Sequence, residues 1–208
     1  MIAIIDYGLG NLESVKYALD RLGVASALTS DAAEIASAPG VILPGVGAFG
    51  RAMAKFRELG LVEASRQAAA SGRPFMGICL GLQLLFSESA EHGRHEGLGL
   101  IDGKVVRFAE GLTVPHMGWN EVRGETPSPL LDGIDDESFF YFAHSYHVAP
   151  DDPAVVIGST DYGGRFASAV RKGNVYGTQF HPEKSGPAGL RMLANFCRLC
   201  GRERQNDE

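Results

Sequence analysis

The chain has 208 residues, of which 45% are hydrophobic, and a formal charge of −6. It is therefore long and apolar enough for the core of an ordinary globular protein. The acidic balance and the lack of a long basic run argue against nucleic acid as a partner. No apolar segment has the length of a membrane span or the pattern of a signal peptide. Because the three cysteines form no disulfide framework, we expect a cytoplasmic protein without a membrane partner.

The N-terminal half alternates predicted strands and helices. Asn11 is a favourable N-cap, apolar residues recur on one helical face after it, and Gly23 stands where a helix would end. Strands are expected within 2–6, 40–44 and 73–78, and helices within 12–22, 52–70 and 80–86. This alternation predicts a largely parallel sheet with helices on its faces.

From about Gly99 onward, short β-type runs follow one another and are separated by turns such as YGG and KGN. The runs are KVVRF, SFFYFAHSYHV, AVVIGS, FASAV and VYGTQF. They predict a mostly antiparallel half, with a hairpin that turns at Gly173 and Asn174. A last helix is expected to begin near Pro187. We expect a single domain over residues 1–200 and a disordered tail over 201–208.

Cys79 lies at the centre of GICLG, where a predicted strand meets a predicted helix. A nucleophile flanked in this way by Gly77 and Gly81 is typical of a sharp, strained turn that exposes its side chain. The start of the helix is expected to favour a thiolate, and the amide of Leu80 is expected to face a developing oxyanion. An isolated cysteine is more often a buried apolar residue, but the two glycines favour the chemical interpretation.

The segment QFHPEKS supplies the groups that a thiolate needs. His181 is a candidate base and acid, and Glu183 is a candidate partner that fixes the tautomer of the imidazole. On its own, H-P-E is more often a surface turn. Beside G-x-C-x-G in a β/α chain, it predicts a catalytic triad of Cys79, His181 and Glu183.

The loop PGVGAFG follows a predicted strand and carries three glycines. A tight turn before a helix would explain it. Its functional interpretation is a second source of backbone N–H groups for an oxyanion, from Val46 or Gly47. YGLGN lacks the third glycine of a dinucleotide-binding loop, so we expect no nucleotide cofactor.

The remaining histidines and cysteines offer no convincing metal or redox site. The histidines concerned are His92, His95, His116, His144 and His147. No pair of them has metal-ligand spacing with a third ligand, so no metal is expected. Cys197 and Cys200 form a lone C-x-x-C near the C-terminus, where a redox role is not expected. The aromatic run 139–142 cannot face one core on all sides, which indicates an interface.

Taken together, GICLGLQLLF and QFHPEKSG resemble the class I, triad-type glutamine amidotransferases. Within that class the chain is similar to the glutaminase subunits of imidazole glycerol phosphate synthase, the histidine-biosynthesis enzyme. The segments IDYGLGNLESV, LPGVGAFG, VPHMGWNEV, FYFAHSYHV and GTQFHPEKSGPAGL carry this resemblance, which runs from residue 2 to about residue 197. It implies a three-layer, flavodoxin-like α/β fold with a central mixed, largely parallel sheet.

The resemblance also implies a reaction. Cys79 attacks the side-chain amide of glutamine, a γ-glutamyl thioester forms, and ammonia leaves, without any cofactor. Leu80, with Val46 or Gly47, would stabilise the oxyanion. The family's glutamine contacts fall on Gly47, Gln83, Glu91, Ser145 and Tyr146.

The implied partner is a separate (β/α)8 cyclase subunit. In the resulting heterodimer the cyclase would use the ammonia to make imidazole glycerol phosphate and aminoimidazole carboxamide ribotide. The matching interface positions are Trp119, Tyr141 and Lys184. Two alternatives stay open: a glutaminase subunit for a different synthase, such as pyridoxal phosphate synthase, and a thiol peptidase-like or sensing protein that uses the same elbow without glutamine.

Overall fold

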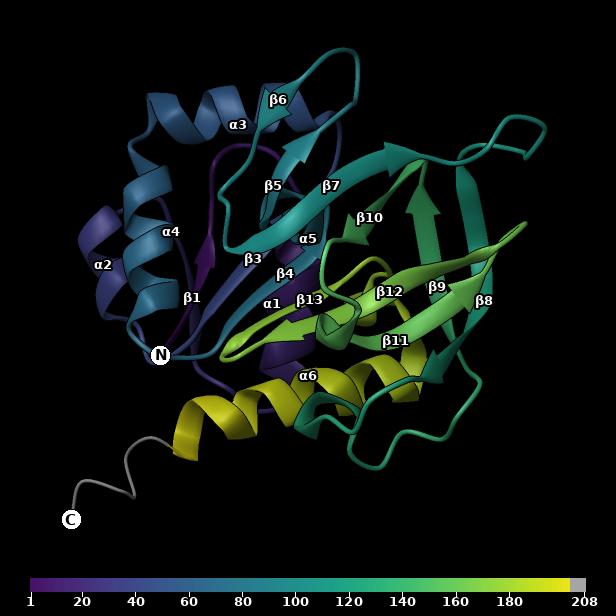
Figure 1. The fold of residues 1–208 in the computed structure, drawn as a ribbon. Helices are drawn as coiled ribbons and strands as arrows, with labels where there is room; N and C mark the ends of the chain where they lie inside the picture. The colour runs from purple at the N-terminus through teal and green to yellow at the C-terminus, as the bar shows by residue number, and fades with distance from the viewer. Residues whose placement is uncertain (203–208) are drawn as a thin grey trace.

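A computed structural model describes residues 1–202 of the chain. Its core is one large mixed sheet (Figure 1), whose main path has the strand order β2-β1-β3-β4-β13-β12-β10-β7-β5-β6. The strands of this path are β1 (Ile2–Ile5), β2 (Ser26–Thr29), β3 (Val41–Gly45), β4 (Phe75–Cys79), β5 (Phe86–Ser89), β6 (His95–Glu96), β7 (Ile101–Arg107), β10 (Tyr146–Pro150), β12 (Arg165–Lys172) and β13 (Val175–Thr178).

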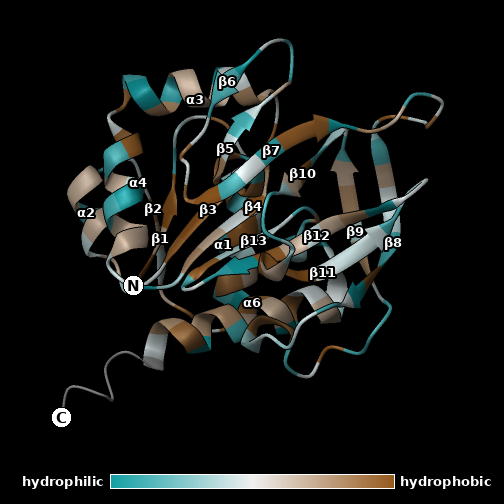
Figure 2. Ribbon diagram, viewed as in Figure 1, coloured by the Kyte–Doolittle hydropathy of each residue, from teal (hydrophilic) through white to brown (hydrophobic). Residues whose placement is uncertain are grey.

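Helices cover both faces of the sheet and give the expected three layers. They are α1 (Leu12–Arg21), α2 (Ala32–Ser37), α3 (Phe49–Glu58), α4 (Leu61–Ala70), α5 (Leu80–Leu84) and α6 (Gly186–Arg202). One core cluster joins the sheet to α1 and α6, and another joins its opposite face to α2, α3, α4 and α5. Strands β1 and β3, which lie between these two helical layers, are drawn mostly brown, that is hydrophobic, in Figure 2.

The parallel half of the sheet consists of strands β2, β1, β3, β4 and β13. Every residue of β1, β3, β4 and β13 is buried, as expected for parallel strands covered on both faces. Strand β4 lies between β3 and β13. The carboxyl ends of these three strands therefore meet at one edge, where α/β proteins bind ligands.

The C-terminal half adds the predicted antiparallel strands. Strands β13, β12, β10 and β7 pair antiparallel along the main path, and β12 and β13 form the hairpin at Gly173 and Asn174. A side branch consists of β11 (Val156–Asp161), β8 (His116–Gly124) and β9 (Ser138–His144). Within this branch, β8 and β9 pair antiparallel, with Trp119 opposite Tyr141. We call this pair of strands the β8–β9 wing.

Four local features differ from the sequence expectations. The stretch 52–70 forms two helices, because the chain turns at Gly60 in a left-handed conformation (φ 68°) that breaks the helical path. Phe86 begins strand β5 instead of ending a helix. The run 138–148 is interrupted at Ser145 and forms two strands. Strand β2 and helix α2 are additional elements whose short, partly polar sequences gave no periodic signal.

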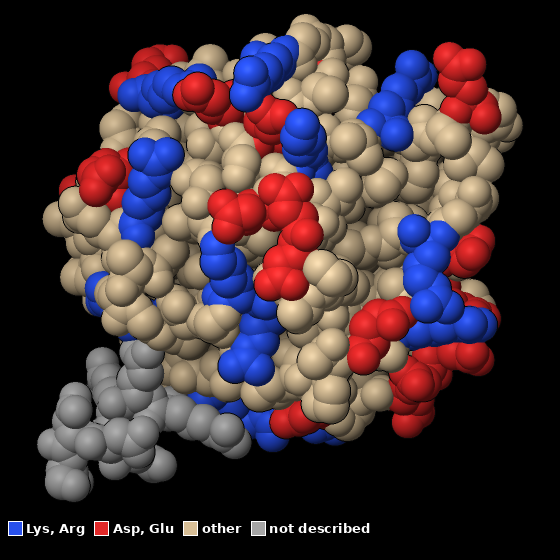
Figure 3. Space-filling view, in the orientation of Figure 1, with Lys and Arg blue, Asp and Glu red and all other residues tan. Residues whose placement is uncertain are grey.

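The C-terminal helix α6 extends to Arg202, two residues past the expected domain limit. The predicted disordered tail otherwise falls on residues 203–208, which lie outside the described residues. Within the described part, no helix is long and apolar enough to cross a membrane. On the face drawn in Figure 3, acidic and basic side chains are interspersed, without a continuous basic field.

Candidate active site

Cys79 sits at the junction of β4 and α5 and is the most strained residue of the site. Its φ of 56° and ψ of −111° lie outside helix and strand conformations, and only 6% of the residue is exposed. The turn is possible because its neighbours are glycines. A Cβ on Gly77 would stand 2.6 Å from the Gly81 carbonyl oxygen, and one on Gly81 would stand 1.8 Å from the Leu43 carbonyl oxygen. The sharp strand–helix turn predicted for Cys79 is therefore present.

His181 and Glu183 lie beside Cys79 at the end of the neighbouring strand. His181 caps the short 3₁₀ helix η3 (Pro182–Lys184), and its Nδ1 is 2.8 Å from Glu183 Oε1. Their side chains are 4% and 1% exposed, respectively. Burial by itself would lower the pKa of His181, but hydrogen bonds to Cys79 and Glu183 raise it to about 10. The three predicted triad residues are thus brought together in a hydrogen-bonded row.

Gln179 is a further polar group at the thiol that the sequence interpretation missed. It is fully buried, and its Nε2 donates to Cys79 Sγ at 3.9 Å, within the range of a hydrogen bond to sulfur. Its Oε1 accepts from Gln83 Nε2 at 3.2 Å. The available signal was its place two residues before His181, since residues i and i+2 of an extended segment share a face.

A cavity of about 320 Å³ opens onto this row. Its walls come from both halves of the sheet, and they include every residue expected from the sequence to be catalytic or to contact glutamine except Glu183. The lining residues are Val46, Gly47, Cys79, Leu80, Gln83, Glu91, Pro115, Met117, Ala143, His144, Ser145, Tyr146, His181 and Lys184. A buried thiol, a base and convergent polar groups in one cavity form a site for nucleophilic attack on an acyl carbon.

Comparison with known proteins identifies the family of this site. The model of the family "Glutamine amidotransferase class-I" matches residues 3–200. Imidazole glycerol phosphate synthase subunit HisH of Moorella thermoacetica is 56% identical over 198 residues, which cover 95% of this chain and 94% of that protein. The subunit HisH of Desulfitobacterium hafniense (strain DCB-2) is 53% identical and covers 94% and 93%, respectively. The chain belongs to the HisH family.

Solved structures agree on the fold of this HisH chain. A crystal structure of a glutamine amidotransferase superposes with a TM-score of 0.77 at 22% identity, covering 97% of this chain and all of the other. The structure of PurLQS from Thermotoga maritima gives a TM-score of 0.77 at 19% identity, with coverages of 95% and 97%. The class I glutamine amidotransferase fold predicted from the sequence is thereby confirmed.

The loop after β3 borders the cavity of this HisH chain on the side of Leu80. Val46 is 39% exposed, and Gly47 has a φ of 96°, a conformation that other residues rarely adopt. A Cβ on Gly47 would meet nothing within 4 Å, so backbone conformation and not space selects glycine there. Gly45, just before it, is selected by space, since a Cβ would stand 2.6 Å from the Tyr7 hydroxyl.

Tyr7 is a second buried polar group that sequence reasoning did not single out. Its ring is fully buried against Phe56, with ring centroids 4.8 Å apart. Within the described residues its hydroxyl has no hydrogen-bond partner. Burial raises the pKa of Tyr7, and the nearby Cys79 raises it further. The hydroxyl is therefore a neutral group beneath the loop that borders the thiol.

Glu91 lies at the rim of the cavity and also has a structural contact. Its Oε2 accepts a hydrogen bond from the backbone N–H of Phe49 at 2.5 Å. Phe49 is the first residue of α3, and the N-cap residue Ala48 has no side chain that could take this role. Glu91 therefore caps α3 from a distant segment of the chain, which fixes its carboxylate beside the cavity.

The predicted interface residues lie on the β8–β9 wing and beside the triad. Phe140 and Phe142 are fully buried, whereas Phe139 is 54% exposed, as the alternation of a strand requires. Trp119 is 56% exposed and packs edge-on against Tyr141. Lys184 Nζ stands 5.9 Å from the centre of the Tyr141 ring. The wing thus presents a surface of large apolar side chains next to the cavity.

Tyr141 is also tied to the catalytic loop through its backbone. Its carbonyl accepts from the N–H of His181 at 2.9 Å, and its N–H donates to Ser185 Oγ at 3.0 Å. Ser185 Oγ in turn donates to the carbonyl of His181. The wing and the loop that carries His181 are therefore held together on both sides of the histidine.

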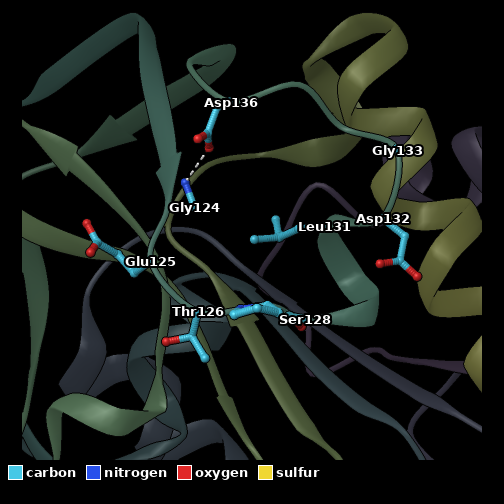
Figure 4. A pocket seen from close by; sticks show the side chains of 9 residues that line it. Gly124, Glu125, Thr126, Ser128, Leu131, Asp132, Gly133 and Asp136 are labelled. Carbon is cyan, nitrogen blue, oxygen red and sulfur yellow. Dashed lines mark hydrogen bonds between the residues drawn. The ribbon is translucent and has the colours of Figure 1, made fainter.

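A separate hollow between the end of β8 and the segment that leads to β9 carries several acids but no convergent site. Its acidic lining residues are Glu125, Asp132 and Asp136. Figure 4 shows that their carboxylates point in different directions, and Asp136 accepts a hydrogen bond from the N–H of Gly124. Among residues 1–202, no group of three or more His, Cys, Asp and Glu side chains is arranged to hold a metal ion.

Proposed function

We propose that this HisH chain hydrolyses glutamine to glutamate and ammonia, with Cys79 as nucleophile, and supplies the ammonia to a cyclase subunit of imidazole glycerol phosphate synthase in histidine biosynthesis. The observation that carries the proposal is the buried row of Cys79, His181 and Glu183, of which Cys79 and His181 line the cavity. It is supported by 56% identity to a HisH subunit over 95% of the chain.

The reaction begins when the Cys79 thiolate attacks the amide carbon of glutamine. The high pKa of His181 means that the imidazolium is present at neutral pH, as the thiolate–imidazolium form of the pair requires. The C–N bond of the tetrahedral intermediate then breaks, and His181 gives its proton to the departing nitrogen, which leaves as ammonia. Neutral His181 next takes a proton from water, which attacks the γ-glutamyl thioester and releases glutamate and the thiolate.

Glu183 holds the imidazole throughout these steps. Its Oε1 accepts from Nδ1, so that Nε2 faces Cys79, and its charge stabilises the imidazolium. Gln179 adds a second donor to the sulfur. The oxyanion of the tetrahedral intermediate is bound by the N–H of Leu80 together with an N–H from Val46 or Gly47.

Glutamine itself is held between the two halves of the sheet. Gly47 and Gln83 contact it from the parallel half, and Ser145 and Tyr146 contact it from the strands of the other half. Glu91 accepts from the ammonium group of the substrate while it keeps its contact with the N-terminus of α3. The bond to the Phe49 N–H fixes the carboxylate before the substrate ammonium group arrives.

The partner docks on the β8–β9 wing, through Trp119, Tyr141 and Lys184. Tryptophan and tyrosine are among the residues that most often dominate the free energy of association. We place a (β/α)8 cyclase subunit there, so that a heterodimer encloses the cavity and receives the ammonia.

The thiol state of Cys79, Cys197 and Cys200 fits a reducing cytoplasm.

The test is glutamate release by the purified chain, with and without the cyclase subunit and its ligand. We expect release in the complex, and a mass increase on Cys79 equal to one γ-glutamyl group when the reaction is stopped with acid. Cys197→Ala is the matched control, because Cys197 is another reduced cysteine but lies on α6 away from the cavity. Absence of glutamate under all conditions would contradict the proposal.

A further inference from the structure

Two buried histidines and an asparagine form a hydrogen-bonded chain that runs from the wing to the cavity. His116 Nδ1 lies 3.0 Å from His144 Nε2, and His116 Nε2 lies 3.2 Å from Asn120 Nδ2. At the inner end, His144 Nδ1 lies 2.8 Å from the carbonyl oxygen of Tyr146. His144 lines the cavity, but His116 and Asn120 do not.

The direction of every hydrogen bond in this chain is fixed from both ends. The Tyr146 carbonyl only accepts, so His144 carries its proton on Nδ1 and accepts at Nε2. His116 must therefore donate from Nδ1 and accept at Nε2. At the outer end, Asn120 Nδ2 donates to the Asp161 carbonyl, and Asn120 Oδ1 accepts from the Glu121 N–H, which orients the amide to donate to His116.

The surroundings keep both rings neutral. Burial lowers the pKa of His116 to about 4 and that of His144 to about 3. The His116 ring is stacked between Phe142 and Tyr162, with ring centroids at 4.7 and 4.1 Å. The titratable groups near these rings are His147, Tyr162 and His181. A proton added to His144 Nε2 would face the N–H of His116, so the chain is intact only in the neutral form.

At its inner end the chain meets the groups that surround the thiol. The Tyr146 carbonyl also accepts from Gln83 Nε2 at 2.9 Å. Gln83 Nε2 is shared with Gln179 Oε1, and Gln179 Nε2 donates to Cys79 Sγ. The orientation of the Tyr146 carbonyl therefore decides where Gln83 and Gln179 are held.

We propose that His116 and Asn120 are positioning residues for the glutamine site, although neither lines the cavity. They act through His144 by fixing the Tyr146 carbonyl and, through it, Gln83. The inference rests on the proposed function, because it assigns these residues to the binding of glutamine. It makes the outer wing, which carries Trp119, part of the machinery that shapes the cavity.

The first test replaces His116 by phenylalanine in the complex with the cyclase subunit. A phenyl ring keeps the stacking on Phe142 and Tyr162 but leaves His144 Nε2 without its donor. We expect KM for glutamine to rise roughly tenfold while kcat stays within about twofold, as for a lost hydrogen bond to a buried acceptor. His147→Phe is the matched control, since His147 packs on the same aromatic cluster but, among residues 1–202, its ring hydrogen bonds only to the Val148 carbonyl.

A rescue variant distinguishes a positioning role of His116 from a packing role. In His116→Asn the amide nitrogen can take the place of Nδ1 and donate to His144, so KM should return to within about threefold of the wild-type value. An unchanged KM in His116→Phe would overturn the proposal, as would an equal rise in His147→Phe. If no variant and no wild-type complex hydrolyses glutamine, the proposed function fails, whereas the measurement below still decides the hydrogen-bond chain.

The second test reads the tautomers directly in the wild-type chain. Nitrogen-15 NMR of the two rings should show both protonated at Nδ1, with neither ring becoming charged between pH 8 and about pH 5. This result is independent of activity and of variant folding. Protonation at Nε2 in either ring would reverse one link of the chain and overturn the proposal, even if His116→Phe fails to fold.

Discussion

The parallel half of the sheet and the β8–β9 wing hold their functional groups by different means. In the parallel half, the position of Cys79 depends on backbone packing: Gly45, Gly77 and Gly81 leave no room for a Cβ. In the wing, position depends on side chains, through the hydrogen bonds of His116, Asn120 and His144. Changes in the parallel half should therefore abolish glutamine hydrolysis or folding. Changes in the wing should alter the binding of glutamine or of the partner.

The largest effect is expected for Cys79→Ala. Loss of the nucleophile should lower glutamate release by roughly 10⁴-fold or more, as for other covalent catalysts that lose their attacking group. The same change removes an interaction that raises the pKa of His181, so this pKa should fall from its value of about 10. Steady-state kinetics and an NMR titration measure the two effects. A His181 pKa that does not fall would contradict the hydrogen bond to the thiol.

Glu183→Gln should give the next largest effect. The amide is isosteric but removes the charge that stabilises the imidazolium, so kcat should fall by roughly 10³-fold, with little change in KM. The pKa of His181 should also fall, because the carboxylate is one of the groups that raise it. Steady-state kinetics of the complex measure kcat. Full activity in this variant would remove Glu183 from the triad.

Gly81→Ala tests the backbone packing of the parallel half. The new Cβ would stand 1.8 Å from the Leu43 carbonyl oxygen, so β3 or α5 must shift. We expect the free energy of unfolding to fall by about 3 kcal/mol, a cost in the range of overpacked sites, together with loss of activity. Chemical denaturation measures the free energy of unfolding. Gly111→Ala is a control glycine in open space, although its φ of 91° adds strain.

Trp119→Ala tests the wing and should have the smallest effect on the chain itself. Because the side chain is 56% exposed, the free energy of unfolding should stay within about 0.5 kcal/mol. The affinity for the cyclase subunit should fall by about 2 kcal/mol, or roughly 30-fold in Kd. Calorimetry with the purified cyclase measures it. An unchanged Kd would move the docking surface away from the wing.

Much of the parallel half and its site could be predicted because each element leaves a local signal. The flanking glycines marked the sharp turn at Cys79, and H-P-E marked the hydrogen-bonded pair of His181 and Glu183 within three residues. Gln179 offered only its place two residues before His181, and Tyr7 offered no local signal, since their contacts are with segments far away in the sequence. The capping contact of Glu91 gave no local signal either, because its bond to Phe49 spans 42 positions. The alternation of side chains along a strand predicted that the aromatic run 139–142 has an outer face. It did not predict that β8 would pair with this strand.

The double tie between Tyr141 and His181 has an evolutionary consequence. The residue whose ring contacts Trp119 and Lys184 on the outer surface is the same one whose backbone supports the catalytic histidine. Because both bonds are made by the backbone, they do not require a tyrosine side chain at position 141. We therefore expect the outer ring to vary between lineages with different partners, while the backbone at this position keeps its support of the imidazole.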